Sequence, residues 1–219
     1  MADGRALLVV LVVVALALAA ALVWRSASGG GDDPADLDEH SARIQRLRRD
    51  GDVPGLVTEA SNPDVRLATR AVEALAFAGP EALPHLERMI KDNAAREVRA
   101  SAVAAFARAA KPGQTRPVAR ALRDDPSPGV RANAAVALGH MHACDEMETL
   151  LSAMDDVDKK VRRRAADAVH QITGVQFSFR AGDSPDRRRA AIDRIRLLWP
   201  HIEPRVRAHH ARPRRDRGR

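Results

Sequence analysis

The chain has 219 residues, enough for one domain with or without an anchoring segment. Aromatic residues make up only 3% of the sequence and tyrosine is absent, whereas a compact α/β enzyme core usually needs more aromatic volume. The apolar content comes instead from Ala, Leu and Val, which favour closely packed helices. The single Cys144 excludes an intramolecular disulfide framework and a multi-cysteine zinc site, and most of the net charge of +7 belongs to the C-terminal segment 204–219.

Residues 6–24 form an uninterrupted apolar run, "ALLVVLVVVALALAAALVW". At about 1.5 Å per residue this run spans a hydrocarbon core of about 30 Å. Trp24 stands at one edge, where an interfacial aromatic residue is expected. We therefore predict a single transmembrane anchor. A cleaved signal peptide, with Ser26-Ala27-Ser28 as its processing site, is the alternative.

Residues 25–36 are rich in Gly and Asp and predict a flexible acidic linker. Arg5 and the amino terminus lie on one side of the apolar run, and Arg25 with the acidic linker lies on the other. The positive-inside rule then favours an exported body, with the anchor in a bacterial inner membrane.

A repeat of almost constant length follows the linker. The segments "EVRASAVAAFARA", "GVRANAAVALGHM" and "KVRRRAADAVHQI" align with valines at 98, 130 and 161, and Leu67 opens a fourth, earlier copy. Each copy places apolar residues at i, i+4, i+7 and i+8, one face of a helix. A shorter apolar segment precedes each copy, and no useful strand-like alternation appears. The sequence predicts an all-α solenoid of four helix pairs over residues 37–173.

These Val-Arg units resemble the HEAT repeat family in its short bacterial form, similar to the repeats of the bilin lyase group. The resemblance implies an inter-repeat ladder in which aspartates and arginines of neighbouring units pair. An aspartate lies six residues before each valine, and an arginine follows each valine. The predicted ladder residues are Asp92, Arg99, Asp124, Arg131, Asp155 and Arg162.

Residues 174–203 predict a C-terminal cap for the last repeat. Phe177 and Phe179 alternate in "VQFSF", and a helix from Ser184 places Ala191, Ile192, Ile195, Leu198 and Trp199 on one face. We expect the aromatic side chains to cover the last repeat. An aromatic ligand pocket is the alternative.

Catalytic and metal-binding constellations are hard to find. His140, His142 and Cys144 are spaced by two residues and lack an evident fourth zinc ligand, so we interpret the two histidines as surface groups at a helix end. Neither a cofactor nor a metal is expected. The alternative to a non-catalytic protein is an enzyme or enzyme accessory resembling the bilin lyase group.

The resemblance implies that the second helix of each pair lines a concave surface. We expect this surface to bind a protein partner, and an ordinary solvent-exposed face is the alternative. This candidate surface is charged at both ends, and its middle consists of small, mostly apolar residues. They are Arg70, Glu73, Ser101, Asn133, Arg163, Arg164 and Asp167.

Residues 204–219 hold seven arginines against one aspartate, whereas the remaining chain has 29 basic and 28 acidic side chains. We predict a basic, disordered tail that could bind anionic lipid or a cell-envelope polymer, or simply remain solvated. Nucleic acid is not the expected partner, because no aromatic residues interleave with the arginines. The tail residues are Arg205, Arg207, Arg212, Arg214, Arg215, Arg217 and Arg219.

Overall fold

The computed structural model describes residues 34–211, with side chains from residue 37 onward. The predicted anchor at 6–24, most of the linker and the end of the chain from residue 212 lie outside this range. Within it, no helix is both long and apolar enough to cross a membrane. The chain divides into two units, Met1–Arg43 and Ile44–Arg219, and α2 (Pro34–Asp50) runs through the division. Residues 34–36 therefore belong to a helix and not to the predicted linker.

The second unit contains four helix pairs, as predicted. They are α3 (Val53–Glu59) with α4 (Val65–Leu75), α5 (Leu83–Asp92) with α6 (Arg96–Ala109), α7 (Arg116–Asp124) with α8 (Pro128–His140), and α9 (Met147–Ala153) with α10 (Lys159–Thr173). Short 3-10 turns, η1 (Pro80–Ala82) and η2 (Cys144–Glu146), precede α5 and α9. No strand occurs among residues 34–211. The all-α solenoid is confirmed for this part of the chain.

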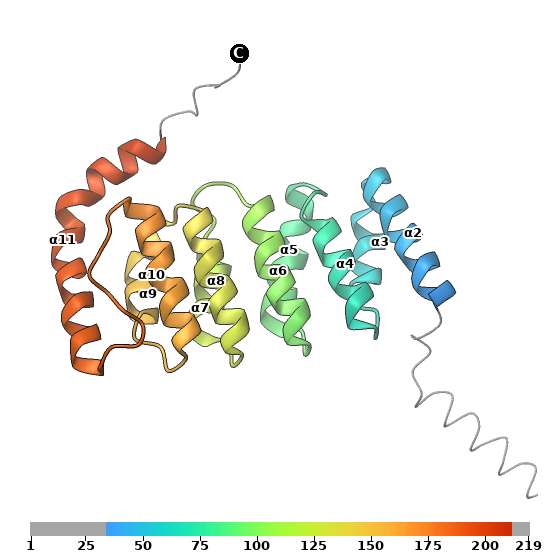
Figure 1. The fold of residues 1–219 in the computed structure, drawn as a ribbon. Coiled ribbons are helices and arrows are strands. Elements are labelled where there is room, and N and C mark those ends of the chain that lie inside the picture. The colour runs from blue at the N-terminus through green and yellow to red at the C-terminus, as the bar shows by residue number, and fades with distance from the viewer. Residues whose placement is uncertain (1–33, 212–219) are drawn as a thin grey trace, which may run out of the picture. The chain divides into compact units, whose positions relative to one another are not determined.

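The second helices α4, α6, α8 and α10 pack on one another in chain order, and each first helix lies against its own partner (Figure 1). The predicted apolar column Leu67, Val98, Val130 and Val161 is buried at each position. Small residues allow the second helices to approach closely. A Cβ atom placed on Gly139 of α8 would lie 3.1 Å from the Cα atom of Ala168 in α10. Glycine at this position therefore favours the close packing of α8 against α10.

Local signals fix where the last pair begins and ends. The side chain of Asp158 accepts hydrogen bonds from the backbone N–H groups of Lys160 and Val161, which caps the start of α10. Gly174 ends the helix in a left-handed conformation with φ of 68°. Between them, Val161, Ala165, Ala168, Val169 and Ile172 are buried at helical spacing, so one face of α10 faces the core.

The cap is a single helix, α11 (Pro185–Ala211), which is longer than predicted. Ala191, Ile192 and Ile195 are buried as expected, but Leu198 is exposed. Prolines at 200 and 204 lie inside the helix, which bends in this region (Figure 1). Beyond the bend, Val206 is buried again. The prediction that a disordered tail begins at residue 204 is wrong for residues 204–211, because this second buried contact continues the helix through both prolines.

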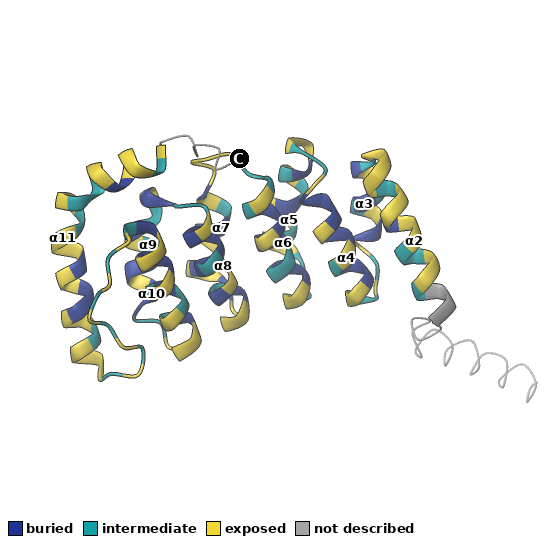
Figure 2. Cartoon of the chain, turned by 45° about the horizontal axis from the view of Figure 1, so that its top comes forward, coloured by how far each residue is buried: buried dark blue, intermediate teal, exposed yellow. Residues whose placement is uncertain are grey.

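Among the residues whose burial is described, 37–211, the buried apolar core runs from Ile44 to Val206 (Figure 2). The second unit therefore closes its own core, and we expect a fragment of residues 34–219, which retains all of α2, to fold without the apolar segment at 6–24.

Candidate functional site

A recurring turn joins the first and second helix of each pair. Asn62, Asn93, Asp125 and Asp156 occupy equivalent positions and recur at the interval of the repeat. The side-chain Oδ1 of each accepts a hydrogen bond from the backbone N–H two residues later, at 2.7 to 2.9 Å. Such Asx turns end the first helix and fix the direction of the second.

The arginine of the Val-Arg pair closes the same turn from the second helix. The Nη1 atom of Arg99 donates to the carbonyl oxygens of Asn93 and Ala94, at 2.9 and 3.1 Å. Arg131 and Arg162 repeat this arrangement with the carbonyl groups six and five residues before them. One guanidinium group therefore satisfies two backbone acceptors in each turn.

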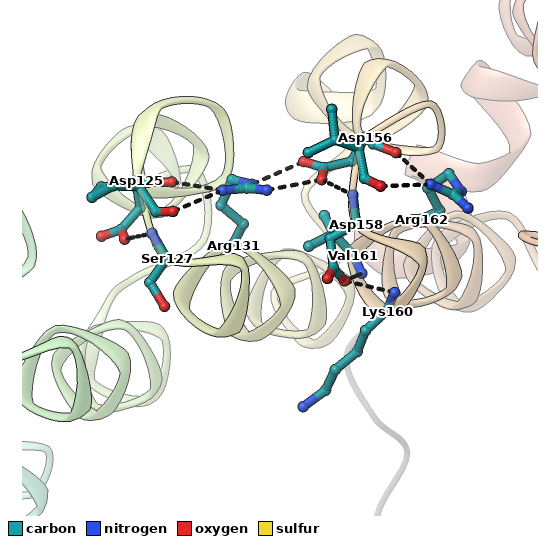
Figure 3. Close-up of polar contacts among 10 residues, drawn as sticks. Asp125, Ser127, Arg131, Asp156, Asp158, Lys160, Val161 and Arg162 are labelled. Atoms are coloured by element: carbon teal, nitrogen blue, oxygen red, sulfur yellow. Dashed lines mark hydrogen bonds and ion pairs between the residues drawn. The ribbon is translucent and has the colours of Figure 1, made fainter.

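The remaining guanidinium atoms reach the next repeat. Arg131 donates from Nε and Nη2 to the two carboxylate oxygens of Asp156, at 2.8 and 2.9 Å (Figure 3). Arg99 forms the equivalent two-bond pair with Asp125, where the side chains are only 10% and 4% exposed. The hydrogen bond to its aspartate partner, the largest cause in each case, raises the pKa of both arginines. These are permanently charged, largely desolvated pairs that fix one repeat against the next.

The predicted ladder has the correct arginines but the wrong aspartates. Asp92 and Asp124 are exposed last residues of their first helices, and the partners of Arg99 and Arg131 are Asp125 and Asp156, each one residue beyond the predicted position. The residue after the helix has left the helical backbone and can form the Asx turn, whereas a residue in the last helical turn points toward solvent. Asp155 pairs instead with Arg188 of α11, at 2.7 Å.

The ladder changes at both ends of the array. Ala68 stands where the first repeat would need an arginine, and the facing residue is Asn93 rather than an aspartate, so both partners of that pair are absent. At the other end Arg162 donates to the carbonyl oxygen of Ala181 in the loop before α11. Arg188 then bonds the carbonyl of Asp183, five residues before it, as a ladder arginine does. The start of α11 thus imitates the second helix of a further repeat.

The predicted binding residues lie on the four second helices. Arg70 and Glu73 are on α4, Ser101 on α6, Asn133 on α8, and the remaining three on α10. Most are exposed, and Ser101 and Arg164 are half-buried. Arg164 and Asp167 form an ion pair with each other at 3.7 Å. We call this set, with the intervening Ala104 and Val136, the second-helix face.

The predicted histidine-cysteine group is dispersed. Nδ1 of His140 lies 3.2 Å from Nε2 of Gln171 in α10, while the ring of His142 stacks on His210 of α11 with centroids 4.0 Å apart. Cys144 is buried, and burial raises the pKa of its thiol. In residues 34–211 no group of three or more His, Cys, Asp or Glu side chains could hold a metal ion. The contact between His142 and His210 joins distant parts of the sequence and had no local signal.

Two hollows accompany these elements. One, of about 400 Å³, lies between the end of α10 and the second half of α11, and Arg205, His209 and His210 are among its lining residues. The other, of about 240 Å³, lies between α5 and α7 over Arg99 and Asp125. Because Arg99 and Asp125 already pair with each other, they are not available to a ligand in the second hollow. The charged groups that remain there are the side chains of both signs at its rim.

The tail arginines are divided by the end of the described residues. Arg205 and Arg207 lie within α11, and Arg207 pairs with Asp145 and Glu203, both at 2.7 Å. The other five, from Arg212 onward, lie outside the described range. Arg207 thus holds α11 against the last repeat and is not a free tail cation.

Stacked helix pairs joined by a buried arginine-aspartate ladder define an α-solenoid. Residues 115–196, which include α7 to α10, match the family model of HEAT repeats. This match confirms the resemblance to HEAT repeats that the Val-Arg units indicated.

Among solved structures, the chain is similar to the complex of CpcE and CpcF of phycocyanin lyase from Nostoc sp. PCC7120, with 21% sequence identity and a TM-score of 0.48. The similarity covers 73% of this chain and 98% of the matched chain. The chain is also similar to a designed armadillo repeat protein in complex with the peptide (KR)4, with 19% identity over 82% of this chain and 92% of that one, and a TM-score of 0.45. Similarity at this level says nothing about function. No curated protein matches the chain.

Proposed function

We propose that the chain is a membrane-anchored HEAT-repeat protein that acts as a non-catalytic scaffold and binds a protein partner along the second-helix face. The observation that carries the proposal is the ladder. Because Arg99–Asp125 and Arg131–Asp156 fix successive repeats at two hydrogen bonds each, the second helices present their outward residues at a set spacing. A preorganised surface loses little conformational entropy when it binds an extended partner.

The chemistry of the face suits an extended peptide or a helix with an apolar centre. Its middle, on α6 and α8, offers Ser101, Ala104, Asn133 and Val136, which are small or uncharged. Its ends, on α4 and α10, carry charges of both signs. A partner with apolar residues flanked by charged ones would match this layout.

Site-specific crosslinking tests the proposal. A photoreactive residue replaces Ala104 or Asn133 in the full chain, and matched controls replace Arg88 and Arg123 on the first helices. We expect one discrete adduct from both second-helix positions and none from the controls. Equal adducts at all four positions, or none on the second helices, would refute a dedicated binding face.

Membrane attachment through residues 6–24 is the second part of the proposal, with the HEAT repeats on the exported side of a bacterial inner membrane. The uninterrupted apolar run supports it. Alkaline extraction of membranes should leave the full chain in the pellet and release a chain that begins at residue 34. Release of both would contradict the anchor, and a shortened amino terminus would show that a signal peptide had been removed.

A further inference from the structure

The second half of α11 faces the end of α10 across the hollow of about 400 Å³. Ile202, Arg205, Val206 and His209 line the hollow from α11, and their spacing of three, four and seven residues places them on one side of that helix. In the first half of α11 the side that faces the last repeat is apolar and buried, as Ile195 is. The inner side of α11 therefore changes from apolar to mixed where the hollow begins.

Apolar side chains from both helices form part of the lining. Val206 is 7% exposed and Ile172 of α10 is 1% exposed, so these two belong to the core as well as to the hollow. Ile202 and Val175 line it beside them and are half-buried. A ligand in the hollow would therefore cover apolar surface that the described residues leave partly open to water.

Several polar groups at the end of α10 already have partners within the chain. The carbonyl oxygen of Ile172 lies 2.8 Å from Nε2 of His210. The carbonyl oxygen of Val175 lies 2.9 Å from Nδ1 of His170, and the N–H group of Val175 donates to Oγ1 of Thr173. We therefore expect the polar group of a ligand to bind side chains of α11.

Arg205 is the cation of this hollow. Its exposed side chain has no hydrogen bond or ion pair among residues 37–211, whereas Arg207, two residues later, pairs with Asp145 and Glu203. His209, one turn beyond Arg205, adds an imidazole ring to the lining. No Asp or Glu occurs among the described residues that line the hollow. The hollow thus combines apolar walls with a guanidinium group that has no carboxylate partner.

We propose that this hollow binds a small carboxylic acid with an aliphatic body. The guanidinium group of Arg205 donates two parallel hydrogen bonds to the carboxylate, His209 donates a further one, and the aliphatic chain covers Ile202 and Val206. Charge complementarity supports an anion, and the apolar walls favour an organic anion over an inorganic one. The volume of about 400 Å³ falls in the range of small-molecule sites. The proposal concerns a different surface from the second-helix face and does not depend on it.

A titration of residues 34–219, which include the buried core from Ile44 to Val206, tests the proposal. Hexanoate is the probe, and the amide chemical shifts of the fragment report both its affinity and its place. We expect shifts in residues 171–175 and 202–210. Affinity should rise from butanoate to hexanoate by about fourfold for each methylene, because each is buried against the apolar walls. Hexanol and inorganic phosphate should bind at least about tenfold more weakly than hexanoate, because one lacks the charge and the other lacks the apolar body.

Variants of one arginine locate the carboxylate. Arg205→Gln should weaken hexanoate binding by roughly 10- to 100-fold, and Arg205→Lys, which keeps the charge without the paired N–H groups, by less. Arg194→Gln is the matched control, since Arg194 is an exposed residue of α11 that does not line the hollow. It should leave the affinity within about twofold of the parent, because it acts only through net charge. The three variants should keep the melting temperature of the parent, since both arginines are exposed.

Several results would overturn the proposal. Equal weakening by Arg205→Gln and Arg194→Gln would mean that net charge alone drives binding. Hexanol or phosphate that binds as tightly as hexanoate would contradict recognition of an organic acid. Shifts confined to residues outside 171–175 and 202–210 would place the probe elsewhere. Full binding by Arg205→Gln, combined with loss of binding on deletion of residues 212–219, would assign the site to the end of the chain.

Discussion

Removal of the Arg131 side chain tests whether the ladder holds the repeats together. In Arg131→Ala the chain loses both bonds to Asp156 and both carbonyl bonds within its own turn. The ion-paired side chains are 12% and 13% exposed, so Asp156 would keep a largely buried charge without its partner. Breaking a buried pair in this way costs about 3 to 5 kcal/mol, and the residual exposure places this pair near the lower value.

Asp124→Ala is the matched control, since Asp124 is exposed and adjacent in sequence to the aspartate that Arg99 binds. We expect a change below about 0.5 kcal/mol in its free energy of unfolding. Asp156→Ala should cost about as much as Arg131→Ala, because it loses the same ion pair and the turn bond to the N–H of Asp158 but keeps the two carbonyl bonds of Arg131. A double-mutant cycle between Arg131 and Asp156 should give a coupling energy of about 1 to 3 kcal/mol.

The assay is urea unfolding of residues 34–219, followed by far-ultraviolet circular dichroism and by the fluorescence of Trp199. Circular dichroism reports all helices, whereas Trp199 reports the cap on the fourth repeat. Because Arg131 joins the third repeat to the fourth, its removal should let the fourth repeat and the cap unfold first, and the two transitions should separate. Coincident transitions with an unchanged midpoint in Arg131→Ala would refute the role assigned to the ladder.

Three further predictions concern single positions. Gly139→Val should lower the free energy of unfolding by about 2 kcal/mol or more, because its Cβ would press on the backbone of Ala168. Gly129→Val, at an exposed position in the first turn of the same helix, measures the cost of a branched residue without this contact, and equal losses in the two variants would contradict close packing of α8 and α10. Asp158→Ala should cost about 1 kcal/mol through loss of the α10 cap, measured by thermal melting, and full stability in Asp158→Ala would show that the cap is dispensable. Burial raises the pKa of the Cys144 thiol, so the folded chain binds the thiol proton more tightly than the unfolded chain does. The free energy of unfolding should therefore fall as the pH rises above about 8.5, the unfolded pKa of a cysteine. This fall with pH should be smaller in Cys144→Ala, and an identical fall in both proteins would contradict burial of the thiol.

The repeat could be predicted because its apolar residues recur at a regular spacing. Leu67, Val98, Val130 and Val161 recur at an almost constant interval, and burial of small residues on one helical face follows from that pattern alone. The arginine that follows each valine could be assigned for the same reason, since its place on the helix fixes the direction of its side chain.

The aspartate partners could not be assigned with the same accuracy. Asp124 and Asp125 are adjacent, as are Asp155 and Asp156, and the sequence does not show which of them is the first residue beyond the helix. If the predicted end of a helix is wrong by one residue, the prediction assigns the ion pair to a solvated aspartate instead of the buried one. The signal that distinguishes them is the Asx turn, since Asn62 and Asn93 mark the equivalent position in the earlier repeats.

The continuation of α11 through two prolines shows where local rules fail. Pro200 and Pro204 each remove a helical hydrogen bond, and the sequence therefore favours an end to the helix before residue 200. Three distant contacts oppose this: Val206 is buried, Arg207 pairs with Asp145, and Nε2 of His210 lies 2.8 Å from the carbonyl oxygen of Ile172. Because the partners of Arg207 and His210 lie 62 and 38 residues earlier in the chain, no window of sequence reveals them. The bend that results keeps the second half of α11 on the last repeat, where Arg205 and His209 line the hollow at the end of α10.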